Sequence, residues 1–299
     1  MATKRPVQPP EIPLNVPAFQ AKIREEGART WRDLPWRHTH DAYEIWISEV
    51  MLQQTQVARV QTRWEEWLDR FPTVDALAVA SDADVLAAWQ GMGYNRRALA
   101  LHEAARRVSE DHGGAFPRER EALLALPGVG PSTAAGIRAF AFDEPDVYLE
   151  TNVRAVFIHE LFPTAQAVAD ASLVPLVRQA CPTTDVRSWY YALLDYGAWL
   201  KRSIPNPTRR ATAYTRQSRF EGSHRQKRAF VLRALLDARQ TGAQGGMAAP
   251  ELADALSAAE LKAGRAAVDE KDVEAVLAEL AREGFCRVSG VLWHAGSGA

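Results

Sequence analysis

Glu49 is a carboxyl group in an otherwise apolar helical run that includes Ile45, Trp46, Met51 and Leu52. Burial among such side chains disfavours the charged form of a carboxylate and raises its pKa. A carboxyl group that keeps its proton near neutral pH can act as a general acid. The apolar neighbours therefore predict a raised pKa and make Glu49 a candidate general acid, and the alternative is a surface or salt-bridged glutamate.

A second stretch, Leu126-Pro-Gly-Val-Gly-Pro-Ser-Thr-Ala-Ala135, combines two glycines with two prolines. Gly128 and Gly130 can take backbone angles that a residue with a Cβ resists, so the spacing predicts a hairpin between two helices. The N–H groups that begin the second helix lack partners and attract phosphate. The stretch thus predicts a phosphate contact, with a plain helix–helix turn as the alternative.

Helical periodicity dominates up to about residue 200, and Gly and Pro separate the segments. We expect helices over 15–26, 43–70, 74–80, 82–89, 94–111, 119–125, 132–141, 153–161, 173–180 and 186–199. Further helices are predicted over 226–238, 249–258 and 270–283, followed by an alternating hairpin over 285–294. These last elements indicate a small winged-helix-like α+β domain over 223–299. Its role is open between DNA contact and a protein-contact or stabilising role.

The charges of the 299-residue chain nearly cancel, with 36 basic and 37 acidic residues. The region 201–228 differs, because it holds nine Lys or Arg residues and one acidic residue, Glu221. Such a local excess of positive charge predicts a track for DNA phosphates. A solvated basic loop is the alternative.

Several features exclude other classes of protein. Residues 1–13 are polar and proline-rich, which predicts a disordered arm rather than a targeting peptide. No apolar run approaches the roughly 20 residues of a membrane span, so we expect no membrane contact. Cys181 and Cys286 lie far apart and form no metal-ligand pattern. We therefore expect a cytoplasmic protein without a metal site.

Three segments together resemble the helix-hairpin-helix (HhH-GPD) DNA glycosylases, most closely the MutY-type adenine glycosylases. They are Trp46–Val57, Leu126–Ala135 and Leu149–Arg154, and the resemblance covers about residues 30–200. It implies a mainly α fold with a glycosylase region over 14–222. One subdomain would span 38–149, and the other would combine 14–37 with 150–222. The implied partner is double-stranded DNA with a mismatch or lesion, bound by a monomer.

The resemblance also implies catalytic roles. Glu49 corresponds to the acid that protonates N7 of adenine, and Glu150 to an aspartate that stabilises the sugar cation. Glu150 is longer by one methylene, and Thr151 replaces a glycine, so we expect either a re-set backbone or altered chemistry. The alternative for Glu150 is a structural role. Asn152 matches a polar partner of the second carboxylate, and Arg37 matches a base-pocket arginine.

Ser132 stands where the endonuclease III branch has a lysine that forms a Schiff base, so the resemblance implies a monofunctional enzyme that uses water. An ordinary helix N-cap is the alternative. Gln53 and Gln54 match the wedge that fills the base stack after flipping. Tyr94 matches a second intercalating residue, and the alternative is a buried aromatic with a bonded hydroxyl. The residues expected to contact the DNA backbone are Gly128, Gly130, Ser132, Thr133, Arg209, Arg210, Arg216 and Arg219.

The sequence departs from the family in two places. Most members bind a [4Fe–4S] cluster through four cysteines after a segment like Leu194–Ala198, but residues 199–210 contain none, so we expect no cofactor. The domain after residue 223 is also too short and too helical for the domain with which MutY enzymes read 8-oxoguanine. We expect hydrolysis of the N-glycosidic bond of a flipped, mispaired base, above all adenine opposite guanine or 8-oxoguanine. The alternatives are a glycosylase for thymine, uracil or an oxidised pyrimidine, and a non-catalytic DNA damage-binding protein.

Overall fold

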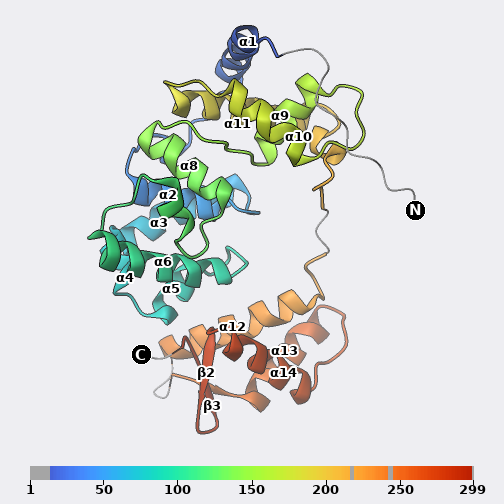
Figure 1. Ribbon diagram of the computed structural model, residues 1–299. Coiled ribbons are helices and arrows are strands. Elements are labelled where there is room, and N and C mark those ends of the chain that lie inside the picture. The colour runs from blue at the N-terminus through green and yellow to red at the C-terminus, as the bar shows by residue number, and fades with distance from the viewer. Residues whose placement is uncertain (1–13, 216–218, 242–244, 298–299) are drawn as a thin grey trace. The chain divides into compact units, whose positions relative to one another are not determined.

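The computed structural model describes residues 14–215, 219–241 and 245–297, and the predicted arm over 1–13 lies outside them (Figure 1). Contacts between residues divide the chain into two compact units. Unit 1 combines residues 1–53 with 116–216, and unit 2 combines 54–115 with 217–299. This division differs from the predicted subdomains, because residues 38–53 and 116–149 fall in the same unit as residues 150–216.

Unit 1 is helical throughout its described part. Its helices are α1 (Val16–Arg29), α2 (Ala42–Met51), α7 (Arg120–Leu124), α8 (Pro131–Phe142), α9 (Thr151–Leu161), α10 (Asp170–Ala180) and α11 (Val186–Ser203). Short 3-10 turns span Pro35–Arg37 and Pro207–Arg210. The core of the unit surrounds α11, whose Trp189, Tyr190 and Leu193 are fully buried.

Two glycines let neighbouring helices approach α11 closely. A Cβ at Gly27 of α1 would lie 2.3 Å from the Cβ of Ala192, and a Cβ at Gly197 would lie 2.2 Å from the carbonyl oxygen of Asn152. Only a residue without a side chain fits either crossing. The second crossing seats the start of α9 directly on α11.

The predicted helix over 43–70 is wrong in one respect, since it is two helices. α2 ends at Met51, and α3 begins at Val57. Gln54, between them, has a φ of 57°, the left-handed conformation that commonly ends a helix. Glycine usually occupies such a position, so a glutamine gives no sequence signal for the break.

Unit 2 contains the remaining helices and the only strands among the described residues. Its helices are α3 (Val57–Arg70), α4 (Val74–Ala78), α5 (Asp82–Ala88), α6 (Arg96–His112), α12 (His224–Thr241), α13 (Ala249–Lys262) and α14 (Glu270–Arg282). The strands are β1 (Met247–Ala248), β2 (Cys286–Ser289) and β3 (Leu292–Ala295), in the antiparallel order β1-β3-β2.

The order helix, strand, two helices and a hairpin is that of a winged helix, which confirms the predicted α+β region. β1 was not predicted, because two residues are too few to show an alternating pattern. Within the part of the chain that the structure describes, no helix is both long enough and apolar enough to cross a bilayer.

Candidate active site

The glycine stretch joins α7 to α8, so the predicted helix-hairpin-helix is present. Gly128 has a φ of 74°, which confirms the need for glycine there. Gly130 has an ordinary φ of −90° and is the N-cap of α8, so the expectation that it needs unusual angles is wrong. Pro131 follows as the first helical residue, where its missing N–H has no cost.

Glu49 lies on α2 where that helix packs against α8. A Cβ added to Gly136 of α8 would come within 2.3 Å of Oε2 of Glu49, so the carboxyl group rests on the α8 backbone. The residue keeps partial exposure, but burial of the carboxyl raises its pKa from 4.5 to about 8. A hydrogen bond from Tyr148 opposes this rise, and the charge of Glu150 adds to it. At neutral pH the carboxyl therefore holds a proton, as the apolar run predicted.

Tyr148 is a residue of this site that the sequence did not single out. Its side chain is buried, and its hydroxyl bonds Glu49. Its backbone N–H donates to the hydroxyl of Tyr190 at 3.2 Å, which anchors the segment to α11. Burial and the nearby charges of Glu49 and Glu150 hold the pKa of Tyr148 well above 10, so it remains a donor. In the sequence it is one more aromatic in an apolar run, which favours a core residue.

Glu150 is the N-cap of α9. Its Oε1 accepts hydrogen bonds from the backbone N–H of Asn152 at 2.6 Å and of Val153 at 3.0 Å. The extra methylene is therefore accommodated by the same capping geometry that a shorter aspartate would use. Thr151 is the first residue of α9 and is exposed, so no glycine-only conformation is required. Of the two expected outcomes, the backbone therefore takes an ordinary helical start at Thr151.

The second carboxylate has further polar neighbours. Nδ2 of Asn152 lies 3.4 Å from Oε2 of Glu150, and Nζ of Lys201 donates to Oδ1 of Asn152 at 2.9 Å. Burial raises the pKa of Glu150 above its ordinary value, while the N–H of Val153 and the charge of Lys201 oppose the rise. The helix N-terminus also favours a negative charge here. Lys201 was noted in the sequence only as part of the basic region.

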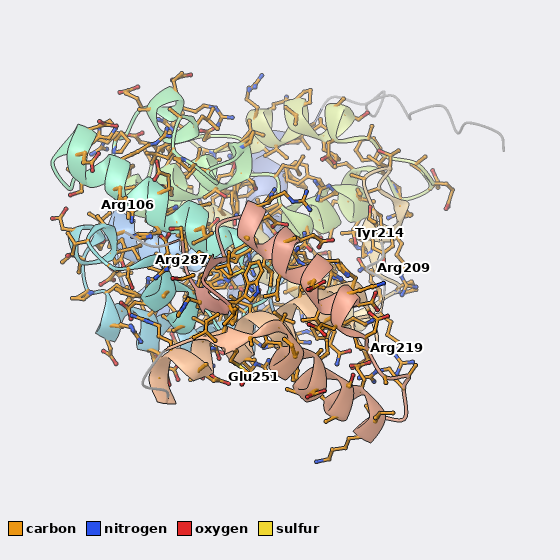
Figure 2. All side chains as sticks on the ribbon, turned by 90° about the horizontal axis from the view of Figure 1, so that it is seen from below. Arg106, Arg209, Tyr214, Arg219, Glu251 and Arg287 are labelled. Atoms are coloured by element: carbon orange, nitrogen blue, oxygen red, sulfur yellow. The ribbon has the colours of Figure 1, made fainter. Side chains whose placement is uncertain are left out.

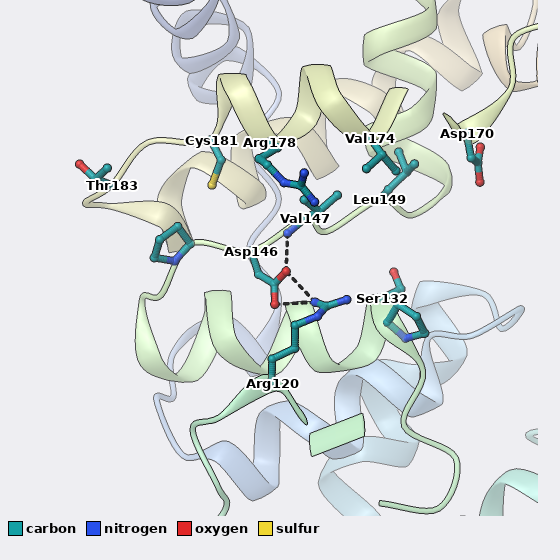
Figure 3. A pocket seen from close by; sticks show the side chains of 12 residues that line it. Arg120, Ser132, Asp146, Val147, Leu149, Asp170, Val174, Arg178, Cys181 and Thr183 are labelled. Carbon is teal, nitrogen blue, oxygen red and sulfur yellow. Dashed lines mark hydrogen bonds and ion pairs between the residues drawn. The ribbon is translucent and has the colours of Figure 1, made fainter. Parts of the chain in front are cut away.

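Ser132 is the second residue of α8 and has a buried Oγ with no hydrogen-bond partner. Because Gly130 is the N-cap, the alternative of a serine N-cap is wrong. Ser132 lines a cavity of about 810 Å³ between the start of α8 and α10, in which Arg120 binds Asp146 through two hydrogen bonds (Figure 3). Leu149 also lines it, but the carboxyl groups of Glu49 and Glu150 do not.

Arg37 does not offer its guanidinium to a base. Its side chain is 1% exposed and forms a two-pronged ion pair with the fully buried Asp195, at 2.7 and 2.8 Å. The guanidinium packs over the rings of Trp31 and Tyr191, with ring centroids 4.6 and 4.4 Å away. The expectation of a base-pocket arginine is therefore corrected to a buried structural ion pair.

The predicted wedge residues follow α2. Gln53 is exposed, and its Nε2 donates to Oγ1 of Thr133 at 3.1 Å. The Thr133 side chain is buried, so its backbone N–H is the group that we expect to meet a phosphate. In unit 2, Gln54 and Tyr94 both have a positive φ, of 57° and 49°. Such strain clusters at functional sites. Tyr94 is 44% exposed and its hydroxyl accepts a hydrogen bond from Arg225 at 3.3 Å, so the buried-aromatic alternative is wrong.

The arginines that were predicted to contact the DNA backbone differ in exposure and in their hydrogen-bond partners. Arg209 is exposed and open to phosphate (Figure 2). Arg210 instead donates to carbonyl groups at the end of α9, including that of Phe162 at 2.5 Å, so its expected DNA contact is corrected to a structural role. Arg219 is exposed but pairs with Glu221 at 3.1 Å. Arg216 lies outside the described residues.

Acidic residues also offset part of the basic region in unit 2. Arg228 of α12 bonds Glu279 and Glu283, each at 2.9 Å, and His224 bonds Glu279 at 2.7 Å. The third helix of the winged helix, α14, therefore presents carboxylates to α12. This pairing leaves less free positive charge than the sequence count indicates.

The thiol groups do not fit an iron–sulfur cluster. A [4Fe–4S] cluster needs four thiolates as a rule, and the chain contains two cysteines. Cys181 follows α10 in unit 1, whereas Cys286 is buried at the start of β2 in unit 2. Among the described residues, no group of three or more His, Cys, Asp or Glu side chains is arranged to hold a metal ion.

Comparison with known proteins bears on this geometry. Residues 47–159, which include the second half of α2, the hairpin and most of α9, match the HhH-GPD superfamily of base excision DNA repair proteins. An adenine DNA glycosylase of Mycolicibacterium smegmatis is 35% identical over 227 residues, covering 69% of this chain and 76% of that protein. The chain belongs to the adenine DNA glycosylase family of this superfamily. A human adenine DNA glycosylase is 41% identical over 150 residues, which is 47% of this chain and 28% of the human protein.

Solved structures agree with this family. A thermostable thymine-DNA glycosylase is 28% identical, with a TM-score of 0.54 over 61% of this chain and 85% of that one. An endonuclease III bound covalently to DNA is 17% identical, with a TM-score of 0.52 over 63% of this chain and 86% of that one. The second likeness shows the shared fold. The glycosylase fold predicted from the three motifs is thereby confirmed.

Proposed function

We propose that this protein is a monofunctional DNA glycosylase of base excision repair that removes adenine from a mispair with guanine or 8-oxoguanine. One observation carries the proposal. Unit 1 brings a proton-bearing carboxyl, Glu49, into electrostatic contact with a helix-capped carboxylate, Glu150. A protonated carboxyl group with a second carboxyl group beside it is the pair of groups that cleavage of a glycosidic bond uses.

The reaction divides between these two groups. Glu49 donates its proton to N7 of a flipped adenine, which makes the base a better leaving group. As the bond from N9 to C1′ breaks, positive charge develops on the deoxyribose. The carboxylate of Glu150 stabilises that charge. Water then adds at C1′ and gives its proton to the Glu49 carboxylate, which leaves an abasic site and restores the acid. Ser132 offers no amine, so no Schiff base forms at that position.

The relatives support adenine as the base, because proteins named adenine DNA glycosylase match this chain in bacteria and mammals. The duplex would be held through the hairpin N–H groups and the exposed Arg209, with Gln53 at the gap in the stack. The protein would act as a monomer on DNA in the cytoplasm. Thymine is the second candidate, since a thymine-DNA glycosylase shares 28% identity and the fold.

A panel of duplexes tests this proposal. Each duplex carries one pair, such as adenine opposite 8-oxoguanine, adenine opposite guanine, or thymine opposite guanine, and hot alkali then cleaves abasic sites. We expect scission at adenine in the duplexes that pair it with guanine or with 8-oxoguanine, with different efficiency for the two partner bases. Scission at thymine alone would replace adenine by the second candidate. Binding without any scission would indicate a damage-binding protein.

Two variants check the assigned chemistry. Glu49→Gln should abolish scission and keep DNA binding, because an amide cannot donate the proton. Ser132→Lys tests whether an amine at that position reaches the sugar, which borohydride would trap as a covalent adduct. A trapped adduct with the wild type would contradict the monofunctional assignment. DNA affinity should also fall steeply with salt, through release of counterions from the phosphates.

A further inference from the structure

Lys201 is linked to the carboxylate of Glu150 through the side-chain amide of Asn152. It lies near the end of α11, and its side chain extends to the first turn of α9, where it contacts Asn152. The approach depends on Gly197, one turn earlier on α11, which lets the backbone of Asn152 rest on that helix. The contact is therefore built into the crossing of two buried helices rather than made by a free surface lysine.

The chemistry of this contact fixes the orientation of the amide. An ammonium group only donates hydrogen bonds, so the atom of Asn152 that faces it must be the carbonyl oxygen Oδ1. The NH₂ group of Asn152 then has to point the other way, and there it meets Oε2 of Glu150 at 3.4 Å. A flipped amide would place its oxygen against the Glu150 carboxylate and its NH₂ group against the ammonium, so Lys201 reinforces the orientation that the carboxylate favours.

Charged groups face Glu150 from each element around it. Arg154 on α9 is committed to Asp170, with bonds of 2.8 and 2.7 Å, which offsets much of its charge. Glu49 on α2 and the hydroxyl of Tyr148 also interact with this carboxyl group and bring no positive charge. Among the described residues, Lys201 forms no ion pair within 4.0 Å with any carboxylate, and Asn152 is its hydrogen-bond partner. Of the two cations that act on Glu150, Arg154 and Lys201, only Lys201 has no carboxylate partner within the described part of the chain.

We propose that Lys201 is a positioning residue for Glu150. It holds the Asn152 amide with its NH₂ group toward the carboxylate, and it supplies the nearby positive charge that favours the ionised form. This assignment rests on the proposed function, in which Glu150 must be a carboxylate beside a protonated Glu49. It gives a specific task to a residue that the sequence shows only as one cation in a basic region.

The test compares Lys201→Met and Lys201→Arg with the wild type. The first readout is the titration of the Glu150 carboxyl in DNA-free protein by ¹³C NMR, assigned with Glu150→Gln. The second is the single-turnover rate of adenine release against pH. Arg202→Met is the matched control, because Arg202 is the exposed next residue and its loss removes the same charge.

We expect Lys201→Met to raise the titration midpoint of Glu150 by about one pH unit, because a nearby opposite charge favours the carboxylate. On the acid side of the rate profile, that shift leaves about tenfold less carboxylate at a given pH, so the rate should fall about tenfold there. Lys201→Arg should recover most of the titration shift. Arg202→Met should leave the titration midpoint in place.

Three results would overturn the assignment. The first is a Glu150 midpoint in Lys201→Met that equals the wild-type value, whatever the loss in melting temperature. The second is an equal shift in Arg202→Met, which would indicate a general charge effect. The third is a borohydride-trapped adduct that disappears in Lys201→Met, since Lys201 would then be a nucleophile. If the wild type releases no base from any duplex, the proposed function fails, and the NMR titration still decides the coupling between Lys201 and Glu150.

Discussion

Replacing Glu49 by glutamine should remove activity and at the same time stabilise the folded protein. The carboxyl of Glu49 is neutral in the fold at neutral pH but ionised in the unfolded chain, because its folded pKa of about 8 lies above the ordinary value of 4.5. Between these values the folded protein binds one proton more than the unfolded chain. The stability that this proton contributes is complete below pH 4.5 and is lost as the pH rises through 8.

The size of the effect follows from that difference. One pH unit corresponds to 1.36 kcal/mol, so moving the pKa from 4.5 to about 8 costs roughly 5 kcal/mol of unfolding free energy above pH 8. At pH 7 the cost is roughly 3 kcal/mol. Both are upper bounds, because the residue keeps some contact with solvent. Glutamine does not titrate, so the unfolding free energy of the Glu49→Gln variant does not fall in this way as the pH rises.

Urea denaturation of the wild type and of Glu49→Gln from pH 5 to pH 9 measures this directly. The gap in unfolding free energy between them should widen up to about pH 8 and then stay constant. Glu25→Gln is the control, because Glu25 is exposed on α1 and should follow the wild type. Parallel curves for Glu49→Gln and the wild type would refute a proton held by Glu49, and with it the general acid.

Further predictions concern the residues around the two carboxyl groups. Gly136→Ala should lower the excision rate by about a hundredfold, because the new Cβ would lie 2.3 Å from Oε2 of Glu49 and displace it, which single-turnover kinetics would measure. The hydrogen bond from Tyr148 lowers the pKa of Glu49, so its loss in Tyr148→Phe raises that pKa. The fall in rate on the basic side should therefore move to higher pH. Asp195→Asn should destabilise the fold by about 3–5 kcal/mol in urea, because it leaves the buried guanidinium of Arg37 without its counter-charge. Thr151→Gly should cost at most about 1 kcal/mol and leave the rate unchanged, and a faster variant would show that the threonine strains the site.

The sequence predicted those parts of the protein whose physics is local. A glycine with a positive φ at position 128, a proline at the first position of α8 and the helical periodicity around them specify a hairpin within about 20 residues. A carboxyl group among apolar neighbours on one helix likewise predicts a raised pKa, and Glu49 has one. The winged helix followed from three helices and an alternating hairpin. Each of these inferences needs only neighbours along the chain.

Tertiary structure alone decided the partners of charged and aromatic side chains. Arg37 is engaged by Asp195, which lies 158 residues away, and Lys201 meets Asn152 from 49 residues away. In the sequence Tyr148 cannot be told from an ordinary core aromatic, and only the fold shows that its hydroxyl bonds Glu49 of α2. A cation's partner depends on which helices cross and how closely, and that is decided by packing. One sequence without its fold therefore identifies the carboxyl groups of this site, while the fold determines which of them keeps its proton and what holds the other in place.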